Sequence, residues 1–351
     1  MLFTDDGFYF VRDYEKWQHI YYLSYEGKNF SYAGDNAPLW RTHLLKVDGK
    51  YLFYTACRES SLRQDIYRIT LKTGKTERVS FGDYDFRGVR ISEDSRRITA
   101  VASNSTTPEM EVEITLPNYL PADKARIKVL HDTKGPEFDK YRIATQEIVP
   151  IRLRGGDTIP VAVIWPFDMD RSGKVKYPVK IDIYGGPDSQ QVYDRFRGVG
   201  FNTQWWANHG VVQITLETRS AGHLGKEGLN SVYRCLGVHE LEDFVDEMKY
   251  FASLPYIDSK RVGIEGYSYG GTMALLAVTE ANEWFQYGIA SAGVMDWSLY
   301  DTHYAERYMD RPQDNPEGYR QSRVMERISK YRGDDTNMLR ITHGSGDDNV
   351  H

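Results

Sequence analysis

A glycine-flanked serine between a strand-like and a helix-like segment constrains the fold more than any other feature of the chain. Residues 261–277 read RVGIEGYSYGGTMALLA, which is an apolar strand pattern, the serine motif and a helix-forming run. A sharp turn from strand to helix needs small residues two positions before and two after its centre, because the two elements nearly collide there. Gly266 and Gly270 meet this need. We therefore expect Ser268 to be a nucleophile at a helix N-terminus, with the Tyr269 N–H as one oxyanion donor.

Short apolar runs alternate with helical patterns around this motif. The predicted strands are 161–165, 179–184, 211–216, 262–265, 287–291 and 339–343, and the predicted helices include 238–254 and 271–281. Such alternation is typical of a mostly parallel sheet with helices on both faces. Together with the serine turn, it predicts an α/β fold of the α/β-hydrolase type for residues 141–351.

The first part of the chain has a different pattern, with short strands and polar turns. Strands are predicted at 7–11, 20–24, 51–56, 66–71 and 98–101, with a hairpin turn at 72–75. Similar strands start at residues 20, 66 and 112, a spacing that suits one four-stranded blade of a β-propeller. A closed propeller needs at least four blades, and this segment supplies two to three. A small antiparallel sandwich with accidental spacing is the alternative.

A connector is predicted between the two parts. The strand pattern breaks up over residues 116–141, which contain Pro117, Pro121 and the Gly135–Pro136 pair. We therefore expect residues 1–140 to be a partial β-propeller with its connector, and residues 141–351 to be the hydrolase domain.

Charge and composition narrow the classes of partner. The formal net charge is −6 with both signs spread along the chain, so no nucleic-acid partner is expected. Cys57 and Cys235 fall in different predicted domains, which indicates no disulfide framework.

The chain has no signal-peptide pattern and no apolar run long enough for a membrane span. It also has no metal-ligand cluster, phosphate loop or dinucleotide fingerprint, so no cofactor is expected.

An acidic candidate follows the last predicted strand. In hydrolases of this type the catalytic acid and histidine come after the serine in the chain. Asp347 and Asp348 both lie just beyond the strand that ends near residue 343, so either could orient an imidazole. We expect this strand to neighbour the strand that carries Ser268.

Five stretches of the second part resemble, in order and approximate spacing, the signature stretches of one peptidase family. They are YGGP at 184–187, TRSAG at 218–222, GYSYGG at 266–271, DWSLYDTHYAERYM at 296–309 and HGSGDDNVH at 343–351. The chain is similar in them to the dipeptidyl peptidase IV-like branch of the prolyl oligopeptidase family. The resemblance is close from about residue 145 onward and loose over residues 1–140, which would be the last propeller blades.

This resemblance implies roles for individual residues. Ser268 would be the nucleophile, Asp347 the catalytic acid and Tyr184 a side-chain oxyanion donor beside Tyr269. The pocket for the residue on the acyl side of the scissile bond (S1) would be lined by Tyr269, Val294, Trp297, Tyr300, Tyr304 and Val350. Asn349 would hold the substrate backbone, and Arg307 would brace that region. Such a pocket suits proline or alanine, so the implied activity is release of N-terminal Xaa-Pro or Xaa-Ala dipeptides from peptide substrates. The resemblance also suggests a homodimer and an extracytoplasmic location.

Two parts of the family pattern are missing. The family's catalytic histidine lies several tens of residues after the acid, whereas His351 is only four residues after Asp347; an unusual triad with His223 stays open. The Glu-Glu pair that holds the substrate's N-terminus is absent from the sequence. We therefore expect an inactive fragment of a dipeptidyl peptidase. Alternatives are an acylaminoacyl peptidase, an oligopeptidase or an esterase on this fold, or a non-catalytic remnant.

Overall fold

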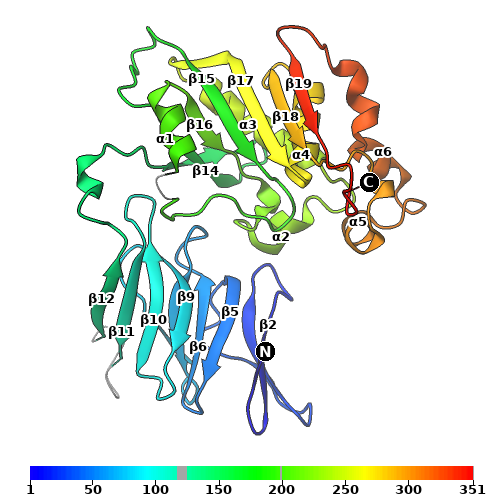
Figure 1. The fold of residues 1–351 in the computed structure, drawn as a ribbon. Coiled ribbons are helices and arrows are strands. Elements are labelled where there is room, and N and C mark those ends of the chain that lie inside the picture. Colours follow the sequence, from blue (N-terminus) through cyan, green and yellow to red (C-terminus); the bar gives the residue numbers. More distant parts are fainter. Residues whose placement is uncertain (117–124, 198–199, 351) are drawn as a thin grey trace. The chain divides into compact units, whose positions relative to one another are not determined.

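Three four-stranded antiparallel sheets form the first part of the chain in the computed structural model, which describes residues 1–116, 125–197 and 200–350 (Figure 1). Each sheet uses four consecutive strands. The strands are β1 (Leu2–Phe3), β2 (Gly7–Arg12), β3 (His19–Ser24), β4 (Phe30–Tyr32), β5 (Trp40–Val47), β6 (Tyr51–Cys57), β7 (Asp65–Thr70), β8 (Lys75–Arg78), β9 (Asp85–Ile91), β10 (Arg97–Ser103), β11 (Met110–Thr115) and β12 (Arg126–Asp132).

The predicted repeat has a simple structural basis. Its three starting positions fall in β3, β7 and β11, which are the third strands of the three sheets. The propeller-like interpretation is confirmed with three blade-like sheets, and the single-sandwich alternative is wrong. Strand β6 is buried on both sides, because Phe53 packs with Phe86 and Ile98 while Leu52 joins Ile20 in a separate cluster.

The predicted connector contains a strand that the sequence pattern did not reveal. Residues 126–132 form β12, which pairs with β11 as the fourth strand of its sheet, so this part of the connector prediction is wrong. All seven residues of β12 are exposed, and an edge strand with no buried face gives only a weak hydrophobic pattern. Pro117 and Pro121 lie outside the described residues.

The chain divides into two compact units near the end of this region. Residues 1–142 form the first unit together with residues 193–197, and residues 143–192 and 200–350 form the second. In the returning segment, the Arg195 guanidinium pairs with the buried carboxylate of Asp85. Asp194 Oδ1 accepts hydrogen bonds from the Ser105 N–H and hydroxyl, each at 2.8 Å. This short segment is therefore part of the first unit, although it follows the first strands of the second.

The second unit is built on a seven-stranded sheet with the order β13-β14-β16-β15-β17-β18-β19. The pairs from β16 to β19 are parallel, and β13 and β14 are antiparallel, so the predicted mostly parallel sheet is confirmed. The strands are β13 (Glu147–Arg152), β14 (Thr158–Ile164), β15 (Tyr177–Ile183), β16 (Val212–Thr215), β17 (Ile257–Tyr267), β18 (Tyr287–Ser291) and β19 (Met338–Thr342).

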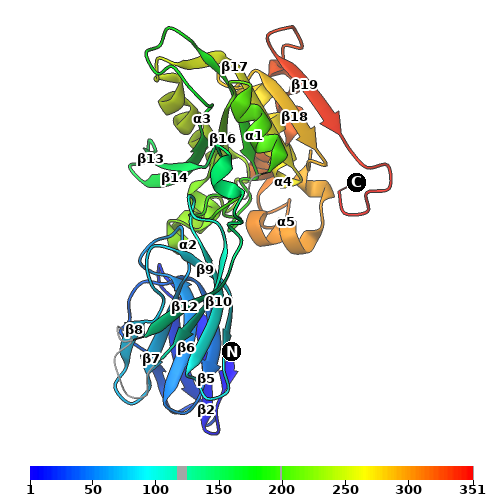
Figure 2. The ribbon, with the colours of Figure 1, turned by 60° about the vertical axis from the view of Figure 1, so that its left-hand side comes forward.

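Helices cover both faces of this sheet. Helix α1 (Phe201–Asn208) links β15 to β16, and α3 (Val238–Ala252) links β16 to β17, in opposite directions along the sheet. Because parallel crossovers are right-handed, the two helices lie on opposite faces (Figure 2). The remaining helices are α2 (Gly225–Asn230), α4 (Tyr269–Glu280), α5 (Thr302–Met309) and α6 (Pro316–Ser322), with 3-10 helices that include η4 (Trp297–Leu299).

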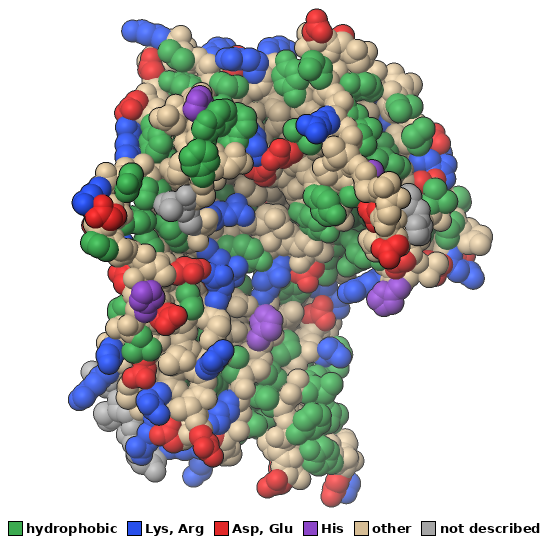
Figure 3. Space-filling view, in the orientation of Figure 1, with side chains coloured by type: hydrophobic (Ala, Val, Ile, Leu, Met, Phe, Trp, Pro, Cys, Tyr) green, Lys and Arg blue, Asp and Glu red, His purple; other side chains and the backbone are tan. Residues whose placement is uncertain are grey.

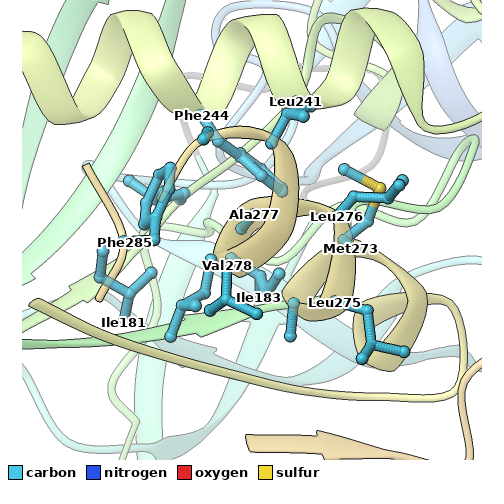
Figure 4. Packing of buried hydrophobic residues seen from close by; sticks show 14 of the residues in the cluster. Ile181, Ile183, Leu241, Phe244, Met273, Leu275, Leu276, Ala277, Val278 and Phe285 are labelled. Carbon is cyan, nitrogen blue, oxygen red and sulfur yellow. The ribbon is translucent and has the colours of Figure 1, made fainter. Parts of the chain in front are cut away.

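Helix α4, which begins directly after the predicted nucleophile turn, is deeply buried. Eleven of its 12 residues are buried, because it lies between α3 and the sheet. Figure 4 shows its side chain Ala277 near Phe244 and Leu241 of α3, and Val278 near Ile183 of β15, all in one apolar cluster. An element packed on several sides holds its first residue in a fixed place.

The surface shows mixed charge. Lys and Arg side chains alternate with Asp and Glu side chains over the face drawn in Figure 3. In the described ranges, none of the helices combines the length and apolar character that crossing a bilayer requires.

Candidate active site

Ser268 occupies the predicted sharp turn. Strand β17 ends at Tyr267 and α4 begins at Tyr269, while Ser268 itself has φ 58° and ψ −121°. This backbone conformation is rare for any residue with a side chain and is characteristic of functional sites. The turn is fixed on both sides: the Ser268 N–H donates to Ser291 O at 2.9 Å, and the Gly271 N–H donates to Ser268 O at 2.8 Å.

Glycines are required at three positions of this turn. A Cβ atom on Gly266 would lie 2.2 Å from Gly270 O, and one on Gly270 would lie 2.5 Å from Ile183 O. A Cβ atom on Gly271 would lie 2.4 Å from Ser291 O. Backbone therefore meets backbone around the serine, which is why the motif has three glycines and why the predicted turn forms.

An aromatic cluster lies beside the turn. The Tyr269 ring is 5.4 Å from the Trp297 ring and 6.1 Å from the Tyr184 ring, between centroids. Trp297 stacks on Tyr304 at 5.8 Å and meets Tyr300 edge-on at 5.7 Å. The structure thus brings together rings from the end of β15, the start of α4, η4 and α5.

Two valines complete the set predicted for the S1 pocket. Val294 and Val350 are buried in the same apolar cluster as Tyr269 and Trp297. They come from the loop after β18 and from the loop after β19. The six residues named for this pocket from the sequence therefore lie in one cluster, and their role as a pocket stays a prediction.

Tyr184 directly follows β15, at the carboxyl end of the sheet. The two glycines after it permit a tight path: Gly185 has φ +78°, and a Cβ atom on Gly186 would lie 2.7 Å from Tyr184 Cε1. Open α/β sheets place their ligands at this end of the strands. That the Tyr184 hydroxyl points toward the Ser268 side chain stays a prediction.

Asp347 has a carboxylate oriented by its own loop. Its Oδ1 accepts the N–H groups of Asn349 at 3.1 Å and Val350 at 3.0 Å. Its Oδ2 lies 3.4 Å from Nε2 of His343, and that ring nitrogen is 2.7 Å from Val350 O. Asp348 is exposed, so Asp347 is the better-held acid of the two.

One expectation about this acid is wrong. The strand before Asp347, β19, does not neighbour β17, because β18 lies between them and pairs with both. The chain enters β18 directly from α4, and this right-handed crossover takes the next sheet position. The acid therefore approaches the serine from two strands away.

The histidines do not form a triad in the described part of the chain. Among the described residues, no histidine nitrogen and no other side chain is hydrogen-bonded to the Ser268 hydroxyl. His223, the candidate for an unusual triad, has Nε2 3.4 Å from Glu217 Oε2, and both residues are buried. His351, predicted not to be the base, lies outside the described residues.

The two predicted substrate-backbone residues differ in their links to the aromatic cluster. Asn349 contacts it directly, because its Oδ1 accepts the Tyr300 hydroxyl at 3.0 Å. Arg307 is one ring further away: its guanidinium lies 5.3 Å from the centre of the Tyr308 ring, which is 4.9 Å from the Tyr304 ring. Both side chains are exposed, but Asn349 is hydrogen-bonded to the cluster, whereas Arg307 reaches it only through Tyr308.

Glu240 belongs to this site but was missed from the sequence. Its fully buried carboxylate accepts the hydroxyl of Tyr269 on Oε1 and the Gly237 N–H on Oε2 at 3.0 Å. Burial raises the pKa of Glu240 to about 7, while the Tyr269 hydrogen bond lowers it. A glutamate at the third position of a helix is a known capping signal. The capping pattern could therefore have indicated the bond to Gly237, but no local sequence pattern indicates the bond to Tyr269, which is 29 residues away.

The fold and the serine turn define a serine hydrolase of the α/β-hydrolase class. Comparison with known families makes this more specific: the prolyl oligopeptidase family matches residues 197–351, and the dipeptidyl peptidase IV N-terminal region matches residues 1–109. The chain belongs to the prolyl oligopeptidase family and is dipeptidyl peptidase IV-like.

Individual relatives agree with this assignment. A protein of Schizosaccharomyces pombe named as a dipeptidyl aminopeptidase is 30% identical over 99% of this chain and 43% of its own length. A protein of Ajellomyces capsulatus (strain NAm1 / WU24) named as dipeptidyl-aminopeptidase B is 40% identical over 56% of this chain and 21% of its own. The crystal structure of Porphyromonas gingivalis dipeptidyl peptidase 4 matches with a TM-score of 0.87 and 29% identity, covering 100% of this chain and 48% of that one. The chain thus spans less than half the length of these relatives.

Proposed function

We propose that the full-length gene product is a serine peptidase that releases N-terminal dipeptides with proline or alanine in the second position. The observation that carries the proposal is the aromatic cluster of Tyr184, Tyr269, Trp297 and Tyr304 beside the Ser268 turn. Flat rings at these distances favour a compact apolar side chain such as the proline ring, and they leave little room for a long one.

The chemistry follows from the residues around the turn. The Ser268 oxygen attacks the carbonyl carbon after the second residue, and the negative charge that forms on the carbonyl oxygen is stabilised by the Tyr269 N–H and the Tyr184 hydroxyl. The C–N bond breaks, the amine leaves with a proton, and water then hydrolyses the acyl-enzyme. The base must be an imidazole oriented by Asp347, and no described histidine is assigned to that role.

Peptides are the proposed partners of the site. Related specificities differ in what lies before the scissile bond, because an acylaminoacyl peptidase requires a blocked N-terminus and an esterase requires no amine. A homodimer and an extracytoplasmic location are proposals that rest only on the resemblance.

A substrate panel tests the proposal on the full-length gene product. It contains Gly-Pro, Ala-Ala and Gly-Leu p-nitroanilides, the N-acetylated Gly-Pro compound and a p-nitrophenyl ester. We expect turnover of free Gly-Pro and Ala-Ala substrates, little for Gly-Leu, and loss of several orders of magnitude in kcat for Ser268→Ala. Preference for the acetylated compound or for the ester would contradict the proposal in favour of an acylaminoacyl peptidase or an esterase. Absence of all turnover would favour the non-catalytic alternative.

A further inference from the structure

A buried link joins α3 to the residue directly after the nucleophile. The Tyr269 hydroxyl donates to one oxygen of the Glu240 carboxylate, and the Gly237 N–H donates to the other at 3.0 Å. Glu240 is fully buried and Tyr269 is 3% exposed. Both carboxyl oxygens therefore have a hydrogen-bond partner, and the phenol is held by a buried ionisable group in a dry environment, where such hydrogen bonds are strong.

Tyr269 serves the site with two different groups. Its backbone follows Ser268 and is fixed by the first turn of α4, so the N–H depends on the turn itself. Its ring lies between the rings of Tyr184 and Trp297, so its tilt decides how far the two sides of the predicted S1 pocket are apart. The hydroxyl anchors the far end of this ring through its hydrogen bond to Glu240.

We infer that Glu240 is a positioning residue that holds the Tyr269 ring and thereby sets the width of the S1 pocket. The inference rests on the proposed function, because it assigns Glu240 to the discrimination between proline and larger side chains. Glu240 does not touch the substrate. Its loss should therefore change selectivity among substrates more than it changes the chemistry at Ser268.

The hydrogen bond between Glu240 and Tyr269 can form whether or not the Glu240 carboxyl is protonated. The titratable neighbours are Asp243 on the same helix, Cys235 in the preceding loop and Tyr304 on α5, in addition to Tyr269 itself. Burial raises the pKa of Glu240 to about 7 and raises that of Tyr269 well above its usual 10. The carboxyl therefore changes charge near neutral pH while the phenol keeps its proton. A neutral acid can donate to the phenol oxygen and accept from Gly237, so the link persists in both forms.

Four single variants and one double variant of the full-length gene product test the inference. Glu240→Leu removes the link, and Tyr269→Phe removes it from the other side while keeping the backbone N–H. Glu240→Gln is the conservative variant, because its amide can donate to the phenol oxygen and accept the Gly237 N–H. Glu247→Leu is the matched control: Glu247 is equally buried on α3, but its carboxylate accepts the Glu217 N–H at 3.3 Å.

The readout is the ratio of kcat/KM for Gly-Pro over Gly-Leu p-nitroanilide. We expect this ratio to fall about 10-fold in Glu240→Leu, mainly through a higher KM for Gly-Pro, because loss of close fit in an apolar pocket has effects of this size. Glu240→Gln should stay within about threefold of the wild type, and Glu247→Leu should leave the ratio unchanged.

The effects of Glu240→Leu and Tyr269→Phe should not add in the double variant, since they remove the same contact. An unchanged ratio in Glu240→Leu, or an equal fall in Glu247→Leu, would overturn the inference. If Glu240→Leu does not fold, Tyr269→Phe takes its place: a fall of about 10-fold in its ratio supports the inference, and an unchanged ratio overturns it.

A spectroscopic arm separates failure of the inference from failure of the proposed function. If the wild type hydrolyses nothing in the panel, the proposed function fails, and the link is tested in protein labelled with 3-fluorotyrosine. The ¹⁹F resonance lost in Tyr269→Phe should move in Glu240→Leu but not in Glu247→Leu. In the wild type it should titrate with a midpoint near pH 7, as the pKa of Glu240 at about 7 requires, and this titration should vanish in Glu240→Gln. A resonance insensitive to both Glu240 variants would overturn the inference whatever the activity.

Discussion

Replacing Glu240 by glutamine should remove one pH-dependent contribution to the stability of the second unit. Burial raises the pKa of this carboxyl from 4.5 to about 7 in the folded chain. The folded state therefore binds the proton more tightly than the unfolded state, so stability from this group is complete below pH 4.5 and is lost as the pH rises to about 7. Glutamine resembles the neutral acid at every pH and should not show this loss.

The size of the effect follows from the two pKa values. A tenfold change in proton affinity is worth about 1.4 kcal/mol. Moving the pKa from 4.5 to about 7 therefore corresponds to a loss of about 3 kcal/mol between low and neutral pH. Glu240→Gln should have nearly the stability of the wild type at pH 4.5 and be about 3 kcal/mol more stable than the wild type at pH 8.

Urea unfolding at several pH values between 4.5 and 8 measures this difference. Burial also raises the pKa of Glu247 and Asp243, but these groups are present in both proteins, so the difference between the two curves reports mainly on Glu240 and its coupling to Asp243. Glu306→Gln, at an exposed position on α5, serves as the control for removal of a carboxylate. Parallel stability curves for the wild type and Glu240→Gln would refute the reasoning, because they would mean that this carboxyl titrates alike in both states.

Three further changes test other parts of the unit. Tyr184→Phe should lower kcat by about 10²–10³-fold, the usual loss of one oxyanion donor, and leave the urea midpoint unchanged; full turnover would remove Tyr184 from the mechanism. Gly271→Ala should lower the free energy of unfolding by about 1–3 kcal/mol, because the new Cβ would lie 2.4 Å from Ser291 O. A thermal unfolding midpoint equal to that of the wild type would contradict this prediction, since it would mean that the turn can relax. Arg219→Ala should cost about 3–5 kcal/mol in urea unfolding at pH 7, because it leaves the fully buried Asp243 carboxylate without its guanidinium partner; a loss below about 1 kcal/mol would count against this account.

Local features of the sequence predicted local structure well. The spacing of Gly266, Ser268 and Gly270 predicted the turn, because its requirement for small residues acts within a few positions of the chain. The repeat spacing predicted the blade-like sheets for a similar reason, because the third strand of each sheet carries a similar local pattern. By contrast, β12 was missed because an edge strand with both faces exposed has no apolar alternation to detect.

Contacts between distant segments could not be predicted in this way. The position of β19 two strands from β17 depends on where the crossover after α4 returns, and no residue near Asp347 encodes it. The link from Glu240 to Tyr269 depends on the packing of α3 against α4. The set of aromatic residues was predicted only through the family resemblance, because rings at these positions would otherwise be read as ordinary core.

The return of residues 193–197 to the first unit determines the order in which the protein can fold during synthesis. Asp85 leaves the ribosome 110 residues before Arg195, its partner in the finished unit. At about 5–20 residues per second, that carboxylate waits on the order of 5–20 s for its guanidinium. Strands β13, β14 and β15 have been made by then, but their neighbours β16 and β17 have not. The nascent chain must therefore carry two unfinished units at once during this interval.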